Sequence, residues 1–264
     1  MGKKADALRA EKAALEETNR DLIQQISALK AERDHQSSEN DSLRAKFVNL
    51  IHGQLKTALK SCRATDEEEN ELEYILPVDL DQSLLDGWER VEIKQAYLED
   101  ILIDQFGEDF EDKKLRIRES HYTSGERANQ TKHEVGLKTR SEGNTHVQEQ
   151  EAPIPDNLFT DIFNEVAEDR RLLKIRYQKD FGDEKVCVDF FIDGDFETGA
   201  VYFVKADIEM PEGRTEPQHT PDVIRQNTLH AVERADRSFS SRKMSSVEYA
   251  QERLKWVLEQ PTAA

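Results

Sequence analysis

Charged side chains at every second position are the feature of this sequence that most restricts its fold. Successive side chains of a β-strand point to opposite faces of the sheet, so residues two positions apart share a face. Residues 92–98 begin the series, with Glu92, Lys94 and Ala96 expected on one face of a short strand. Later pairs that carry one sign on one face are Arg116 and Arg118, Glu149 and Glu151, Lys174 and Arg176, and Asp207 and Glu209.

Two architectures are compatible with this alternation. The first is an antiparallel sheet with one dry face and one charged face in water. The second is a closed antiparallel β-barrel whose charged faces line a tunnel. In such a tunnel the cations would hold phosphate groups and the carboxylates would hold a metal ion. The period of the pattern alone does not choose between them.

The first sixty residues predict a different structure. They contain no proline, and leucine recurs at seven-residue intervals with Gln36 as the one gap. Asn19 and Asn40 fall on the other core position of the heptad, which favours a parallel two-stranded pairing. We therefore expect residues 1–62 to form a long coiled-coil helix in a homodimer. An amphipathic helix folded back on its own domain is the alternative. The leucines of the seam are Leu8, Leu15, Leu22, Leu29, Leu43 and Leu50.

Composition excludes several classes of protein. The chain of 264 residues has a formal net charge of -18, which argues against general nucleic-acid binding through a basic surface. No apolar run approaches the length of a membrane span, and the N-terminus lacks the apolar core of a signal peptide. Cys62 and Cys187 are the only cysteines, and their spacing is not that of metal ligands. These observations predict a cytoplasmic protein without disulfides.

Changes in composition along the chain suggest four parts, of which the predicted coiled coil of residues 1–62 is the first. Residues 63–87 are expected to be an acidic linker and lead-in, because residues 66–71 are acidic and lack apolar anchors. Residues 88–245 contain the alternating strands, together with an amphipathic helix after Pro155 that is expected to cover the outside of the barrel. Residues 246–264 are expected to form a C-terminal helix and tail. The predicted fold class is thus α+β, with flanking helices around the strands.

From about residue 88 to 245 the sequence resembles the CYTH superfamily, also called triphosphate tunnel metalloenzymes. Members open with a strand of the form Glu-x-Glu-x-Lys, which residues 92–98 resemble. Further segments match the family's later strands in the same order. They are residues 115–118, 130–132, 149–155, 174–177, 188–191, 206–210 and 236–242. The N-terminal leucine repeat lies outside the resemblance.

The resemblance implies a closed antiparallel barrel of about eight strands with a charged tunnel through it. It also implies a triphosphate-containing ligand and Mg²⁺ or Mn²⁺ as cofactor. The matching phosphate binders are Arg116, Arg118, Lys132, Lys174 and Arg176. The matching metal ligands are Glu149, Glu151, Asp207 and Glu209, with Glu92 as a further carboxylate of the first motif and Asp189 as another inward candidate.

Departures from the family pattern fall mainly in the first motif. Lys94 stands where the family usually has its second glutamate, and Ala96 stands where many members have lysine. Glu92 and Lys94 are therefore the candidate catalytic residues, but an ammonium at position 94 would repel a metal ion beside Glu92. Val147 replaces a family arginine, and Asp207 is shorter than the glutamate it replaces. Phosphate binding is thus better preserved than metal catalysis.

Two functions from different classes follow from this interpretation. As an enzyme, the protein would be a Mg²⁺- or Mn²⁺-dependent phosphohydrolase acting on inorganic triphosphate, a nucleoside triphosphate or a polyphosphate. As a binding module, it would hold a polyphosphate or nucleotide without turnover and signal through the coiled-coil dimer. A purely structural barrel is a third alternative.

Overall fold

The computed structural model describes residues 53, 70–98, 113–140, 147–211, 213–233 and 236–260. The chain divides into two compact units, Met1–Gly53 and Gln54–Ala264, and nearly all of the described residues belong to the second. The predicted coiled coil of residues 1–62 lies outside the described residues apart from Gly53.

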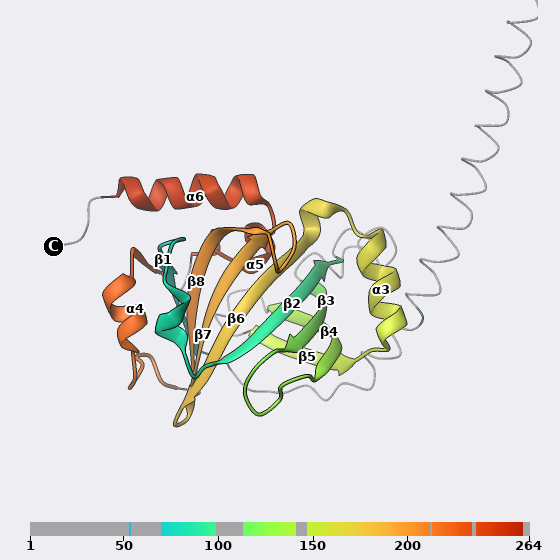
Figure 1. Cartoon of the computed structure of the whole chain (residues 1–264), viewed down its shortest axis with the longest axis horizontal. Coiled ribbons are helices and arrows are strands. Elements are labelled where there is room, and N and C mark those ends of the chain that lie inside the picture. The colour runs from blue at the N-terminus through green and yellow to red at the C-terminus, as the bar shows by residue number, and fades with distance from the viewer. Residues whose placement is uncertain are drawn as a thin grey trace, which may run out of the picture. The chain divides into compact units, whose positions relative to one another are not determined.

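The second unit is built on one nine-stranded sheet with the order β5-β4-β3-β2-β6-β7-β8-β1-β9. Figure 1 labels strands β1 to β8 of this sheet. Every neighbouring pair of strands is antiparallel. The strands are β1 (Asn70–Leu76), β2 (Glu89–Tyr97), β3 (Lys113–Tyr122), β4 (Thr131–Arg140), β5 (Val147–Pro153), β6 (Arg171–Phe181), β7 (Glu184–Asp193), β8 (Ala200–Met210) and β9 (His230–Val232).

The predicted closed barrel is corrected by this topology, because the sheet is open within the described residues. Strand β5 pairs there with β4 alone and β9 with β1 alone, so both remain edges. Strand β9 has only three residues, too few to continue the ladder to another long strand. Closure depends on the tilt and stagger of the strands, which the alternation of side chains does not encode.

Strand β1 lies in the segment that we assigned to the acidic lead-in. It is inserted between β8 and β9 and pairs with β8 along its whole length, from Asn70 opposite Met210 to Leu76 opposite Val204. The next strand, β2, pairs with β3 and β6 instead. The acidic segment therefore contributes an interior strand of the sheet.

Short helices flank the strands. They are η1 (Gln82–Leu85), α3 (Asp156–Glu165), η3 (Glu168–Arg170), α4 (Asp222–Asn227), α5 (Ser241–Met244) and α6 (Val247–Glu259). Helix α3 buries Leu158, Phe159 and Ile162 of the predicted apolar stripe. The side chain of Ser246 accepts a hydrogen bond from Tyr249 N and so caps α6, the predicted C-terminal helix. No helix in the described ranges is long and apolar enough to cross a membrane.

Strands β6, β7 and β8 bury side chains on both faces. On one face Val188 and Phe190 belong to an apolar core that includes Leu85 of η1 and Ile224 of α4. On the other face Phe191 belongs to a second core that is shared with α5 and α6. The same face also carries charged residues outside this second core. We call this side of the sheet the charged face. It is defined by Glu71, Glu73, Gln95, Arg116, Arg118, Glu151, Lys174, Arg176, Asp189, Lys205 and Asp207, which the strand pairing places on one side.

Candidate anion and metal site

Two cations and one carboxylate form the buried centre of the charged face. Lys174 and Arg176 lie two residues apart on β6, and Asp189 of β7 is directly opposite Arg176. Lys174 Nζ is 2.5 Å from Asp189 Oδ2, while Arg176 Nε and Nη2 donate to Oδ1 and Oδ2 at 2.7 and 2.8 Å. The carboxylate is fully buried and the lysine side chain is 3% exposed. One carboxylate cannot neutralise two cations, so this triad is an electropositive point.

Ionisation within the triad follows from burial and charge. Burial, together with the charge of Arg176, lowers the pKa of Lys174 to about 7. Burial alone would raise the pKa of Asp189, but Arg176 and Lys174 hold it well below its usual range. Lys174 is therefore the member of the triad that gives up its proton most easily, because the excess positive charge disfavours its ammonium form.

An acidic cluster lies next to the triad, on β1 and β8. Glu71, Glu73 and Asp207 each offer a carboxylate oxygen, and these oxygens lie within 4.8 Å of one another. Lys205 enters the cluster, with Nζ 2.8 Å from Glu73 Oε1 and 3.0 Å from Asp207 Oδ1. Burial raises the pKa of Asp207 to about 6, although Lys205 opposes the shift. Burial would lower the pKa of Lys205, but Asp207 and Glu73 raise it well above its usual value, so the ammonium is retained.

Arg176 joins the triad to the acidic cluster. Its Nη2 atom, which donates to Asp189, also lies 3.7 Å from Asp207 Oδ2. Asp189 is opposite Lys205 in the β7–β8 pairing, so the two groups of charges occupy adjacent positions on adjacent strands. The electropositive and electronegative parts of the face are thus in direct contact.

Two arginines of β3 extend the charged face on the other side of β6. Arg118 Nε donates to Gln95 Oε1 at 3.3 Å, and the charge of Arg118 contributes to the lowered pKa of Lys174. Arg116 Nη2 donates to Glu151 Oε1 at 3.1 Å, and Arg118 Nη1 lies 3.9 Å from the same atom. Glu151 of β5 thus holds both guanidinium groups in position.

The remaining predicted ligands lie at the margins of this arrangement. Lys132 shares the face, since it is opposite Ser120, but it is half exposed and forms an ion pair with Glu134. Glu209 is opposite Glu71, with Oε2 3.6 Å from Lys185 Nζ. The backbone of Glu149 pairs with Lys138 in the β4–β5 ladder, but its side chain lies outside the described part of the chain.

The expectation that Glu92 and Lys94 line the charged face is corrected by the strand register. Val91 is opposite Arg176 and Ile93 is opposite Lys174, so the residues at positions 92 and 94 point to the other side of the sheet. There Glu92 forms a 2.8 Å ion pair with Arg90, and Lys94 Nζ lies 2.9 Å from Glu119 Oε1. Alternation identifies residues that share a face, but it does not say which face. Lys94 therefore does not oppose a metal ion at the acidic cluster.

Glu71, Glu73 and Lys205 were missed by the sequence interpretation. Glu71-Leu-Glu73 carries the Glu-x-Glu alternation that was sought in residues 92–98. The acidic run of residues 66–71 gives this segment the composition of a linker. Lys205 precedes the predicted segment 206–210 and continues the alternation of Asp207 and Glu209 by one step. This place in the alternation was the feature of the sequence that could have identified Lys205 as a residue of the charged face.

The solved structures to which this chain is similar include three that illustrate the low level of similarity. The inorganic triphosphatase NE1496 is 17% identical over 69% of this chain and 96% of that chain, with a TM-score of 0.37. The PH1012 protein from Pyrococcus horikoshii OT3 is 15% identical over 56% of this chain and 80% of that chain, with a TM-score of 0.35.

A chain in the structure of the Schizosaccharomyces pombe Mediator head module is 12% identical, covers 57% of this chain and 86% of that chain, and has a TM-score of 0.36. No protein-family model matches the sequence, and no curated protein matches it. TM-scores of 0.35 to 0.37 do not establish a family, so the functional conclusions depend on the geometry of the charged face.

Proposed function

We propose that the charged face binds a triphosphate-containing small molecule or a polyphosphate together with one divalent metal ion. The observation that supports this most directly is the double contact of Arg176, at 2.8 Å from Asp189 and 3.7 Å from Asp207. It brings a net positive triad within reach of a cluster of metal-binding carboxylates. Phosphoryl ligands are bound in this way, by cations on the oxygens and a metal ion beside them.

The phosphate part of the site consists of Arg116, Arg118, Lys174 and Arg176. Guanidinium groups present parallel N–H donors that match two oxygens of one phosphate, whereas an ammonium acts as a point charge. Gln95 and Glu151 already orient the β3 arginines, which lowers the conformational entropy lost when an anion binds.

The chemistry of the acidic cluster suits a divalent metal ion. Carboxylate oxygens are the ligands that Mg²⁺ and Mn²⁺ prefer, and Glu71, Glu73 and Asp207 bring them together. Asp207 Oδ1 is buried and accepts no hydrogen bond from the described residues, although Lys205 Nζ lies 3.0 Å away. A bound ion would supply charge neutralisation and polarisation of a phosphoryl oxygen.

Charge balance predicts that metal and anion bind together. Among the residues that define the charged face, five cations (Arg116, Arg118, Lys174, Arg176 and Lys205) stand against five carboxylates (Glu71, Glu73, Glu151, Asp189 and Asp207). Lys132 and Glu209, at its margins, each pair with an opposite charge. With the formal charges cancelled, the face alone attracts a polyanion weakly. A divalent ion on the carboxylates would leave an excess of two positive charges, and a triphosphate would compensate that excess. The affinity for triphosphate should therefore rise when Mg²⁺ or Mn²⁺ is present.

Calorimetry tests the coupling between metal and anion. Triphosphate should bind the wild-type protein more tightly with Mg²⁺ than without it. Glu73→Gln should remove most of that metal effect, because it takes one carboxylate from the acidic cluster. The control is Asp183→Asn, which removes a carboxylate that pairs with Arg214 at 2.8 Å, outside the cluster. This control should keep the full metal effect.

An activity assay separates the two forms of the proposal, a phosphohydrolase and a binding module without turnover. Phosphate release from triphosphate, ATP, GTP and thiamine triphosphate, with Mg²⁺ and Mn²⁺, distinguishes a phosphohydrolase from a binding module. Absence of triphosphate binding with either metal would refute both forms.

A further inference from the structure

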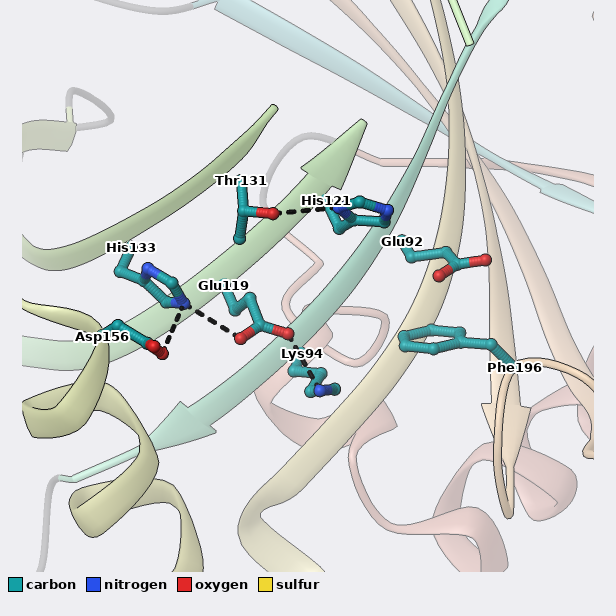
Figure 2. Close-up of a pocket in the computed structure, with 8 residues that line it drawn as sticks. All are labelled: Glu92, Lys94, Glu119, His121, Thr131, His133, Asp156 and Phe196. Carbon is teal, nitrogen blue, oxygen red and sulfur yellow. Dashed lines mark hydrogen bonds and ion pairs between the residues drawn. The ribbon is translucent and has the colours of Figure 1, made fainter. Parts of the chain in front are cut away.

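A pocket of about 440 Å³ lies on the side of the sheet opposite the charged face. Its floor includes one cross-strand row, in which Lys94 of β2 is opposite Glu119 of β3, and Glu119 is opposite His133 of β4. Asp156 joins this row from the first turn of α3 (Figure 2). The proposed function does not use any of these four residues.

Three of these side chains converge on one point. His133 Nε2 lies 3.0 Å from Glu119 Oε2 and 3.4 Å from Asp156 Oδ1. Figure 2 shows the imidazole directed between the two carboxylates. Nε2 carries at most one proton, so it cannot fully satisfy two carboxylates at once. The arrangement therefore places more acceptor oxygens around Nε2 than one N–H group can serve.

The separations match those between ligand atoms of one metal ion. With metal–ligand bonds of about 2.0–2.1 Å, ligands at a tetrahedral angle lie about 3.3–3.4 Å apart, and ligands at a right angle about 2.9 Å apart. The 3.4 Å between His133 Nε2 and Asp156 Oδ1 is the tetrahedral separation, and the 3.0 Å between His133 Nε2 and Glu119 Oε2, a hydrogen-bond distance in the absence of an ion, is about 0.3 Å shorter than it. All three ligand atoms lie within 4.8 Å of one another.

Neighbouring groups hold the first two ligands in place. Lys94 Nζ lies 2.9 Å from Glu119 Oε1, so the ammonium occupies one oxygen and leaves Oε2 directed at His133, while its charge opposes the binding of a cation at Glu119. The ring of Phe159 packs on the imidazole with 5.3 Å between centroids. The backbone N–H of Ile154 donates to the carbonyl of His133 at 3.0 Å, which ties the start of α3 to β4. Metal ligands are commonly oriented by a second layer of contacts of this kind.

We propose that Glu119, His133 and Asp156 form a binding site for one divalent transition-metal ion, with Zn²⁺ as the best match. One imidazole and two carboxylates are ligands that Zn²⁺ accepts in tetrahedral sites, with water as the fourth ligand. Asp156 is 78% exposed at its side chain, so the site is open to solvent on that side. The imidazole distinguishes this site from the all-oxygen cluster of Glu71, Glu73 and Asp207, which suits Mg²⁺ or Mn²⁺.

A second row of the same pocket supplies the control. Glu92, His121 and Thr131 are opposite one another on β2, β3 and β4. Glu92 forms a 2.8 Å ion pair with Arg90, and His121 Nδ1 lies 2.9 Å from Thr131 Oγ1. His121 thus has its own partner away from the three proposed ligands, and its removal should leave the metal site intact.

The test is calorimetry with Zn²⁺ on the full chain, with excess Mg²⁺ present to saturate the acidic cluster. We expect one tight Zn²⁺ site in the wild type. Loss of one outer-layer contact weakens metal binding by about 10–100-fold, so removal of a ligand in His133→Asn or Glu119→Gln should weaken it by about 100-fold or more. His121→Asn should bind as the wild type does.

Two further readouts make the result decisive. Zn²⁺ should shift the imidazole nitrogen resonances of His133 and should leave those of His121 in place. Zn²⁺ should raise the thermal midpoint of the wild type but not that of Glu119→Gln, a near-isosteric change that preserves packing. Undiminished Zn²⁺ affinity in both His133→Asn and Glu119→Gln would overturn the proposal. Displacement of Zn²⁺ by Mg²⁺, or loss of Zn²⁺ binding in Glu73→Gln, would also overturn it, because either result would place the ion at the acidic cluster.

Discussion

Arg176 and Asp189 face each other across β6 and β7 and are joined by two parallel hydrogen bonds of 2.7 and 2.8 Å. The carboxylate is fully buried, and the guanidinium side chain is 13% exposed. Asp189 also accepts from Lys174 at 2.5 Å. A single buried carboxylate therefore holds Lys174 and Arg176, both cations of the proposed phosphate site, in their positions.

Asp189→Asn should strongly destabilise the fold. It removes the carboxylate that Lys174 and Arg176 share and leaves Arg176 only its 3.7 Å contact with Asp207. Breaking a buried ion pair in this way costs about 3–5 kcal/mol. Urea unfolding followed by circular dichroism measures the difference. The matched control is Asp222→Asn, which removes the partner of Arg225 in an exposed pair and should change stability by less than about 1 kcal/mol. Equal effects of the two substitutions would contradict the structural role of the triad.

Arg118→Ala should weaken triphosphate binding by about 1.5–3 kcal/mol, because hydrogen bonds to charged groups contribute that much. Arg118→Lys should recover only part of the loss, since an ammonium lacks the two parallel donors of a guanidinium. Lys179→Ala serves as a control, because Lys179 is an exposed cation of β6 on the other side of the sheet. Calorimetry in Mg²⁺ gives the affinities. Equal affinities for Arg118→Ala and wild type would remove Arg118 from the site.

Binding of triphosphate should be coupled to proton uptake by Lys174. The pKa of Lys174 is lowered to about 7 in the free protein. A polyanion beside the ammonium stabilises the charged form and raises this pKa. Between the free and bound pKa values the complex holds more protons than the free protein, so affinity should increase as the pH falls toward about 7.

Calorimetry in two buffers of different ionisation enthalpy measures the proton uptake. Triphosphate itself also titrates in this range, so Lys174→Met provides the baseline for the ligand. A proton uptake that is equal in the wild type and in Lys174→Met would show that Lys174 does not titrate on binding.

Residues 1–62 should make the protein a dimer. The leucine repeat and the two core asparagines favour a parallel pair. Light scattering should give a dimer for the full chain and a monomer for a version that starts near residue 65. A monomeric full chain would contradict the prediction, and so would a dimer that survives the truncation.

Alternation predicted strands and shared faces well, but it could not predict orientation or closure. Arg116 with Arg118, and Lys174 with Arg176, do share one face of the sheet. The side of the sheet to which Glu92 points depends on its pairing with β6, which a local pattern does not contain. Openness of the sheet likewise depends on strand tilt.

Residues that are distant in sequence were the hardest to predict. Glu119, His133 and Asp156 belong to two strands and a helix. The cross-strand register brings Glu119 and His133 together, and the position of α3 adds Asp156. Glu71 and Glu73 had a visible pattern, but their acidic surroundings resembled a solvated segment. Composition over a few residues thus concealed a strand whose stability comes from its partner β8.

Phe191 and Phe203 stand directly beside the buried charges. The two rings are opposite each other on β7 and β8, two residues along from Asp189 and Lys205, and Phe239 and Met244 pack behind them. Lys174 Nζ lies 5.8 Å from the centroid of the Phe191 ring. On β7 and β8 the charges therefore end against apolar side chains, whereas on β3 Arg118 and Arg116 continue past this level. A polyphosphate bound at Lys174 would extend toward the arginines of β3 and not toward Phe191 and Phe203.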